Sequence, residues 1–450
     1  MLRILLALSL PVLLLAHAGN CSQCGGCKVL PTDIGPIHCH WLEVTGVEPG
    51  GQAANLDVRP GDIIHSYAGQ TIGCLDDLRS AMAGVDSGPV EVVLMRDGNP
   101  VGLLFEAGRL GVFLKEWRND IVPDPDAVII PDVPALGWHT GKQATALAAL
   151  EAARWPLGDR AGYTFLMGCS GQAFRFQFHE EWCPSSPAAE VGAPTLERAF
   201  RTRGLTMDEY QLSTDGKNRP AILGAVIAAI DSGIPVLGCG LTDKWEWGLV
   251  YGYQREGEDL FCRSYGDTRK KREIAHQFPW SVIIPRRTGK PDELGAAYEG
   301  FPAVVTDLET EKYGRYFSGL AALREWASRL RTEDFTSRDS AGFSEVVQAN
   351  YWSFTRLVHD RETGVDYLEA LAEHHLPHFK PMLDSLAGLY EEEVALLRPF
   401  IDSLGCPGTL TEPEQWTPEQ RNAQAEVVES ALKLEERALP VWQMLALAEH

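Results

Sequence analysis

Two residues in the middle of the chain have the chemistry of a nucleophile and its base. Cys169 lies in the stretch GCSG, whose small residues would let a substrate approach the thiol, and Ser170 beside it is a second candidate nucleophile. Glu246 lies between Trp245 and Trp247, where burial would raise the pKa of its carboxyl group enough for it to accept a proton. The opposing interpretation is that Cys169 is only a core residue, because buried free cysteines are common and a nucleophile without a positioned base is weak.

Two histidines extend this set. His139 stands just before a predicted helix and His179 follows another. A histidine near a helix end is more often a capping or surface residue than a catalytic base. Neither therefore decides between an enzyme and a binding protein.

A second group of reactive residues lies near the N-terminus. Cys21, Cys24, Cys27 and Cys39 occur within 19 residues, and two histidines flank Cys39. Thiolates at such spacing can hold zinc or an iron–sulfur cluster, which would be the chain's cofactor. Disulfide bonds explain the same cysteines equally well, since the spacing between the groups is irregular.

The first 18 residues predict that the protein is exported. Arg3 precedes an apolar run that ends in the small-residue pattern Ala16-His17-Ala18, as in a secretory signal peptide of residues 1–18. The apolar run is too short to span a bilayer, and no later stretch is apolar enough. We therefore expect an exported protein, periplasmic or extracellular, without a transmembrane segment and with a cysteine-rich segment at 19–40.

Length and charge narrow the classes of partner. The chain has 450 residues, of which 45% are hydrophobic and 23% charged, and its net charge is −22. This length allows two to four domains with cores of their own. The negative charge argues against nucleic acids and anionic membrane surfaces, which require clustered lysine and arginine.

Residues 41–118 carry linked turn and strand signals. The stretches EPGGQAA, RPGDII and GQTI precede a helical segment with Leu75, Leu78 and Met82 on one face, and a hairpin follows with its turn at Asp97-Gly98. This run resembles bacterial PDZ domains. The resemblance implies a mainly-β domain that binds an extended peptide between a strand and a helix, with backbone amides of a glycine-containing loop receiving the peptide's C-terminal carboxylate.

The loop expected to receive the carboxylate comes late in this sequence. GRLGVFL at 108–114 is similar to the family's loop-and-strand element, and a circular shift of strand order would bring it to the same place. Leu110, Gly111 and Val112 would then frame the carboxylate, with Leu75, Leu78 and Met82 on the opposite wall. The alternative is that the three apolar helix residues only fill the core.

Residues 119–136 are a proline-containing linker, and residues 137–290 predict an α+β domain. Thr140 and Gln143 form the pattern of a capping box before a helix that runs to Arg154, and residues 161–178 read as a second helix. Further helices and antiparallel strands follow, with helices first and sheet afterwards.

This second region resembles the N-terminal domain of the butirosin biosynthesis protein H family, which has a papain-like cysteine peptidase fold. The stretches that carry the resemblance are YTFLMGCSGQAFRF, IDSGIPVLGCGL, WEWGLVYGY and PWSVIIP. In that family a cysteine starts the first helix, a histidine on a strand activates it, and an Asp or Asn on the next strand orients the histidine. This sequence has Thr140-Gly141, Glu246, and Ser264 or Asp267 at the corresponding places, so the cysteine and histidine are missing.

Two functions follow from these substitutions. In the first, the domain has lost its catalytic pair and binds a ligand in a pocket lined by Thr140, Trp245, Trp247 and Tyr251, although the tryptophans could equally be core residues. In the second, Cys169 with Glu246 and Asp267 forms a different active site of an acyltransferase or amide hydrolase.

Residues 291–450 predict an all-α bundle with apolar residues at helical spacing, which the same family also carries. The chain is therefore expected to be multidomain, with a mainly-β PDZ domain, an α+β papain-like domain and this bundle. Protein or peptide C-termini are the expected partners, and the oligomeric state stays open.

Overall fold

The computed structural model describes residues 40–48, 50–73, 75–85, 87–96, 99–118, 123–242, 246–265, 272–403, 410 and 412–448. Contacts divide the chain into two compact units, which are described separately below. Unit 1 comprises residues 1–121 and unit 2 comprises residues 122–450.

Unit 1 is built on one antiparallel sheet with two helices. Its elements are β1 (His40–Val47), α1 (Gln52–Asn55), β2 (Ile63–Tyr67), β3 (Gln70–Thr71), α2 (Leu75–Ala83), β4 (Pro89–Arg96), β5 (Asn99–Glu106) and β6 (Val112–Arg118). The strand order is β5-β4-β2-β1-β6, with β3 paired to β2. The last strand in sequence therefore lies beside the first, at one edge of the sheet.

A buried ion pair fixes the turn between β1 and β2 of unit 1. Asp62 is 1% exposed, and its two carboxylate oxygens accept from Nε and Nη2 of Arg96, both at 2.7 Å. The Arg59 amide also donates to Asp62. The Arg96 guanidinium therefore holds the pKa of Asp62 below its usual range. The aspartate of the RPGDII turn and the arginine before the hairpin turn are thus partners.

Unit 2 contains a larger antiparallel sheet and a small one. Its strands are β7 (Val128–Ile129), β8 (Gln177–His179), β9 (Leu205–Gln211), β10 (Val236–Cys239), β11 (Trp247–Gln254), β12 (Asp259–Arg263), β13 (Glu273–Ile274), β14 (Ser281–Arg287), β15 (Lys312–Tyr313) and β16 (Tyr316–Ser318). The larger sheet has the order β13-β12-β11-β10-β14-β9, with β7 paired to β11, and the smaller one has the order β15-β16-β8.

The helices of unit 2 fall into an early group and a C-terminal group. The early ones are α3 (Thr145–Arg154), α4 (Tyr163–Cys169), α5 (Thr195–Thr202) and α6 (Arg219–Asp231), with the 3-10 turns η1 (Trp138–Thr140), η2 (Gln172–Phe174) and η3 (Arg255–Gly257). The C-terminal ones are α7 (Glu293–Glu309), α8 (Gly319–Thr332), α9 (Ser340–Ala370), α10 (Lys380–Ser403) and α11 (Pro418–Ala446), with the short turns η4 (Leu371–His375), η5 (Pro377–Phe379) and η6 (Pro413–Gln415).

Two local expectations are wrong. The first helix does not begin at a capping box formed by Thr140 and Gln143, because α3 begins at Thr145 without a side-chain cap. The Thr140 hydroxyl instead donates to the Gly137 carbonyl at 2.7 Å. The expected helix over 161–178 is also broken, because Gly171 takes a left-handed conformation (φ 82°) and the chain then continues into η2 and β8.

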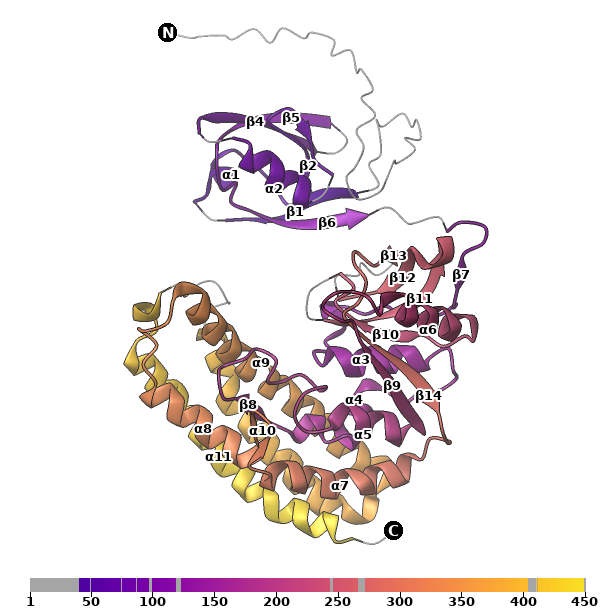
Figure 1. Cartoon of the computed structure of the whole chain (residues 1–450). Helices are drawn as coiled ribbons and strands as arrows, with labels where there is room; N and C mark the ends of the chain where they lie inside the picture. The colour runs from indigo at the N-terminus through magenta and orange to yellow at the C-terminus, as the bar shows by residue number, and fades with distance from the viewer. Residues whose placement is uncertain are drawn as a thin grey trace, which may run out of the picture. The chain divides into compact units, whose positions relative to one another are not determined.

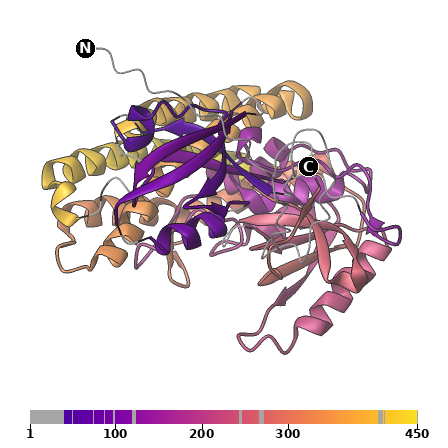
Figure 2. The same cartoon turned by 90° about the horizontal axis from the view of Figure 1, so that it is seen from above.

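Figures 1 and 2 show α9, α10 and α11 lying side by side, with α3, α4 and α5 between these long helices and the larger sheet. Close packing of α4 against α9 and α7 joins the two groups. A Cβ on Gly168 would lie 2.1 Å from the Tyr367 ring, and one on Gly300 would lie 3.0 Å from the Cys169 carbonyl. The segments 137–290 and 291–450 are therefore parts of one compact unit.

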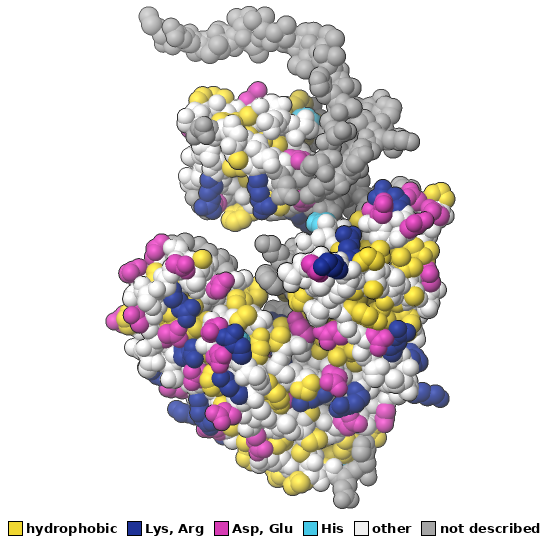
Figure 3. Space-filling view, viewed as in Figure 1, with side chains coloured by type: hydrophobic (Ala, Val, Ile, Leu, Met, Phe, Trp, Pro, Cys, Tyr) yellow, Lys and Arg dark blue, Asp and Glu magenta, His cyan; other side chains and the backbone are white. Residues whose placement is uncertain are grey.

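The surface of the helical part carries both signs of charge. In Figure 3, acidic and basic side chains are interspersed over the region of α8 and α11. Arg324 with Glu436 and Arg331 with Glu429 are ion pairs between these two helices. Such exposed pairs contribute little to stability, about 0–1 kcal/mol each.

A buried ionic cluster joins the three long helices. Arg361 on α9, Glu393 on α10 and Glu435 on α11 are all 0% exposed. The guanidinium Nε of Arg361 lies 2.9 Å from Glu435 and 3.3 Å from Glu393, and its Nη1 donates to the Ala173 carbonyl at 2.7 Å. Burial beside a second carboxylate raises the pKa of Glu393 well above its usual range.

The raised pKa of Glu393 predicts a pH-dependent effect of Glu393→Gln. A raised folded pKa means that folding takes up protons at Glu393 when the pH lies above the unfolded pKa of about 4.3. The contribution of Glu393 to stability is therefore full below that unfolded pKa and is lost as the pH rises towards the folded pKa. The glutamine side chain is neutral without binding a proton, so it takes up no proton on folding. We expect the stability of Glu393→Gln relative to wild type to increase from pH 5 to pH 8, by at most about 1.4 kcal/mol per pH unit.

Urea unfolding of the full chain at several pH values would measure this effect. Glu392→Gln is the matched control, because Glu392 is the preceding residue and its side chain is 55% exposed. A pH-independent difference between Glu393→Gln and wild type would contradict the prediction.

Candidate functional site

The edge strand β6 of unit 1 has backbone groups directed away from the sheet. Val47 lies opposite Val112 in the ladder between β1 and β6. The neighbouring hydrogen bond is donated by the Glu48 amide to the Gly111 carbonyl at 2.9 Å. In an antiparallel ladder the N–H and C=O of Val112 then point to the other side. The Val44 amide donates to the Asp62 carbonyl just before β2, so the backbone N–H and C=O of its partner Leu114 also point away from β1. The backbone N–H and C=O of Glu116, two residues later, point the same way.

The loop before β6 presents two consecutive amides. The carbonyls of Leu110 and Gly111 accept from the amides of Ala53 and Glu48. Since N–H and C=O point in opposite directions across a trans peptide, the amides of Gly111 and Val112 face away from those two donors. The left-handed conformation of Gly111 (φ 74°) makes this possible, and adjacent amides of this kind bind anions.

Side chains of α2 and β6 would form the two walls of the peptide groove that the sequence predicts. Leu75, Met82, Val112 and Leu114 are partly buried and pack against the core of unit 1. Leu78 and Leu110, by contrast, are only 4% and 5% exposed and belong to the core of unit 1. Sequence reasoning missed Glu116, whose Oε2 accepts from the Leu75 amide at 3.2 Å and thereby links β6 to the start of α2.

In unit 2 the start of α3 touches the start of β11. The Trp247 amide donates to the Thr145 hydroxyl at 3.3 Å. Trp247 itself is 2% exposed, and Glu246, directly before it, is half-buried, with its carbonyl accepting from the Gly240 amide. Thr145, at the observed start of α3, therefore makes the contact with β11 that was expected from the sequence near Thr140.

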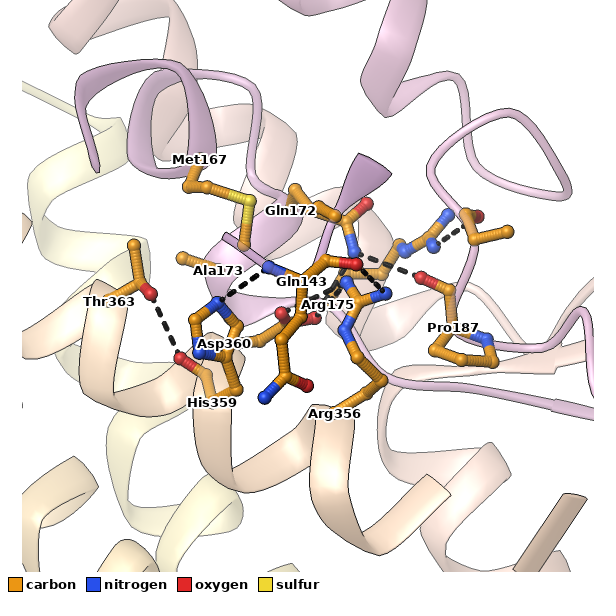
Figure 4. Close-up of polar contacts among 12 residues, drawn as sticks. Gln143, Met167, Gln172, Ala173, Arg175, Pro187, Arg356, His359, Asp360 and Thr363 are labelled. Carbon is orange, nitrogen blue, oxygen red and sulfur yellow. Dashed lines mark hydrogen bonds and ion pairs between the residues drawn. The ribbon is translucent and has the colours of Figure 1, made fainter. Parts of the chain in front are cut away.

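A polar cluster on α9 holds the chain just before α3 (Figure 4). Nε2 of His359 accepts from the Gln143 amide at 3.4 Å, and Arg356 donates to the Gln143 carbonyl at 3.0 Å. Arg356 also pairs with Asp360, whose second oxygen accepts from Gln172 at 3.2 Å. Because a backbone amide only donates, Nε2 of His359 carries no proton, and burial lowers the pKa of His359 below its usual range.

A cavity of about 1090 Å³ opens beside this cluster, between α3 and α4 on one side and α9 and α10 on the other. Thr140, Tyr163 and His359 lie in its wall together with the ion pairs of Lys142 with Glu151 and of Arg398 with Glu362. The Tyr163 hydroxyl accepts from the Ala144 amide at 2.9 Å and lies 3.3 Å from Nε2 of His359. Trp247 and Tyr251 are not among the lining residues of this cavity.

Cys169 lies at the end of α4 inside the core and is 2% exposed. Its Sγ lies 3.5 Å from the Thr202 hydroxyl and 3.8 Å from the Leu166 carbonyl. Burial raises the pKa of the Cys169 thiol to about 12, so the thiol stays protonated at neutral pH. This environment is that of a packing residue.

The remaining candidates also have structural partners. Ser170 is fully buried and its hydroxyl donates to the Met167 carbonyl, while Ser264 donates to Glu273 at 2.7 Å. His179 on β8 is 7% exposed, and its Nδ1 accepts from the Glu181 amide. Burial lowers the pKa of His179. Tyr251 is 4% exposed on β11.

Several expectations fall outside the described residues. The backbone of His139 is described within η1, but its side chain is not. The other residues concerned are Trp245, Asp267, the signal sequence, and Cys21, Cys24, Cys27 and Cys39. Within the described ranges, His, Cys, Asp and Glu residues form no group of three or more that could hold a metal ion. Across the same ranges, every helix is too short or too polar to cross a membrane.

Comparison with known proteins identifies part of unit 1. A family model described as the PDZ domain matches residues 43–96, so this segment is a PDZ domain. The match ends with β4, and the edge strand β6 lies beyond it. No curated protein matches the chain.

Burial predicts the order of thiol labelling in unit 2. Cys183 is half-exposed, whereas Cys169, Cys239 and Cys262 are buried. Under native conditions an alkylating reagent should modify Cys183 at least roughly ten times faster than Cys169, because the buried thiol is neither accessible nor ionised. Peptide mass spectrometry would give the rates, and labelling in denaturant is the control. Preferential native labelling of Cys169 would restore it as a candidate nucleophile.

The lowered pKa of His359 predicts a pH effect of opposite sign to that of Glu393. As the pH falls below about 6.5, the unfolded chain binds a proton at His359 before the folded chain does, so this contribution to stability is lost. We expect His359→Gln to gain stability relative to wild type by about 1 kcal/mol between pH 7.5 and pH 5.5. His374→Gln, at a side chain that is 70% exposed, is the control. A pH-independent difference measured by urea unfolding would refute this.

Proposed function

We propose that this chain is an exported protein that binds free protein or peptide C-termini in an extended conformation at β6 of unit 1. The observation that carries the proposal is the directed backbone of 111–116: two amides at one end, followed by outward-facing groups at Val112, Leu114 and Glu116. A peptide added there as a strand gains main-chain hydrogen bonds along its length.

The direction of the bound peptide follows from this geometry. Its carboxylate meets the amides of Gly111 and Val112 at the start of β6, and its remaining residues extend towards Glu116. The peptide therefore runs antiparallel to β6. The half-buried side chains of Leu75, Met82, Val112 and Leu114 favour apolar residues near the peptide's C-terminus.

We also propose that residues 137–290 have a papain-like arrangement that binds rather than cleaves. Its support is the contact between the start of α3 and the start of β11, where the related family would place a cysteine and a histidine. Here Thr145 and Trp247 meet. Burial of Cys169 argues against the alternative nucleophile, and the cavity between α3–α4 and α9–α10 offers space for a ligand.

Peptide binding by the full chain tests the first proposal. A fluorescent ten-residue peptide that ends in apolar residues should bind with its free carboxylate and lose roughly tenfold or more in affinity when amidated, because the amide removes the charge that the loop receives. Met82→Glu should weaken binding to a similar degree by placing a charge on the groove wall.

Leu104→Glu is the matched control, since Leu104 is 63% exposed on β5 at the opposite edge of the sheet. It should leave the affinity unchanged in fluorescence anisotropy titrations. Equal binding of the amidated peptide, or loss of binding in Leu104→Glu alone, would refute the assignment to β6.

A further inference from the structure

Charged and polar groups differ between the two ends of the groove between β6 and α2. At the end where β6 begins are the two amides of Gly111 and Val112, with Arg109 beside them in an ion pair with Glu48. At the other end, the described side chains include the carboxylates of Glu116, from β6, and Asp77, from the first turn of α2. A ligand with a carboxylate at one end and a cation at the other would match both ends.

Glu116 reaches across the groove. Its backbone lies in β6, while Oε2 accepts from the amide of Leu75 at the start of α2. The side chain thus spans from strand to helix and remains half-buried. A peptide that extends beyond this point has to pass close to this carboxylate.

The strand register identifies the peptide residue that meets Glu116. In the antiparallel arrangement, the C-terminal residue lies opposite Val112 and the third residue from the end lies opposite Leu114. The fifth residue from the end then lies opposite Glu116. Alternation places its side chain on the same face as those of Val112, Leu114 and Glu116, the face that packs towards the core and α2.

We propose that Glu116 makes this groove selective for peptides with lysine or arginine at the fifth residue from a free C-terminus. The inference rests on the proposed peptide-binding function. The cation would lie near Glu116 in a half-buried setting, where an ion pair is stronger than on an open surface. Asp77 adds to the negative charge at that end of the groove.

Matched peptides would test this selectivity on the full chain. Two labelled peptides of ten residues differ only at the fifth residue from the end, Lys in one and Glu in the other. At low salt, wild type should bind the Lys peptide about tenfold more tightly. The preference should fall to about twofold in Glu116→Gln, which keeps an oxygen acceptor for the Leu75 amide.

Glu116→Lys should reverse the preference in favour of the Glu peptide, and thermal unfolding would verify that this variant is folded. Glu91→Gln, at an exposed position on β4, is the control and should keep the wild-type preference. If both peptides bind and the preference is the same in wild type and Glu116→Gln, the selectivity is refuted while peptide binding stands. If neither peptide binds wild type, the peptide-binding proposal itself fails.

Discussion

The architecture of unit 2 depends on the buried guanidinium of Arg361. One cation lies between two carboxylates, and its Nη1 donates to the Ala173 carbonyl in the early part of the unit. Desolvating these charges costs free energy unless all their partners are in place. A partly assembled cluster therefore destabilises the fold relative to an apolar core at the same place. Because the partners come from α9, α10, α11 and η2, the cluster favours a fold in which these elements form together.

The same constraint extends to the cavity and to the start of α3. The polar cluster of Arg356, His359 and Asp360 lies within five residues of Arg361 on α9. The contacts that hold Arg361 therefore also set the position of these three side chains along the helix axis and around it. Gln143 is held by two of these side chains, although 216 residues separate it from His359. Two residues later, Thr145 accepts from Trp247 of the larger sheet. A continuous set of polar contacts therefore leads from the helical bundle to the edge of β11.

How well the sequence predicts an element depends on how far apart in the sequence its contacting residues lie. In unit 1 the turns are predicted from neighbouring residues, by RPGDII and by Asp97-Gly98 after Arg96. Residues 43–96 of this unit are a PDZ domain. In unit 2, the sequence predicts the start of α3 four residues too early, with Thr140 in place of Ala144 as the N-cap. The pair Thr140 and Gln143 matches a capping pattern, but side chains of α9 hold the backbone of Gln143 in a different conformation. The break at Gly171 was missed because an apolar helical pattern continues through it. The wall of the cavity that α9 and α10 provide has no signal in the sequence of residues 137–290.

The two candidate sites consequently differ in what sustains them. The groove proposed for unit 1 is formed by elements within residues 40–118, and the selectivity proposed for it depends on one strand register and on Glu116. The cavity of unit 2 needs the helices that follow residue 340, since His359 and Arg356 position the chain before α3. At the start of α3 the Thr145 hydroxyl accepts a hydrogen bond from the Trp247 amide of the larger sheet. A buried charge network thus holds the helices that line the cavity, while the groove proposed for unit 1 depends on backbone groups of β6 that are directed away from the sheet. A single side chain such as Glu116 would therefore change the proposed recognition without altering the charge network of unit 2.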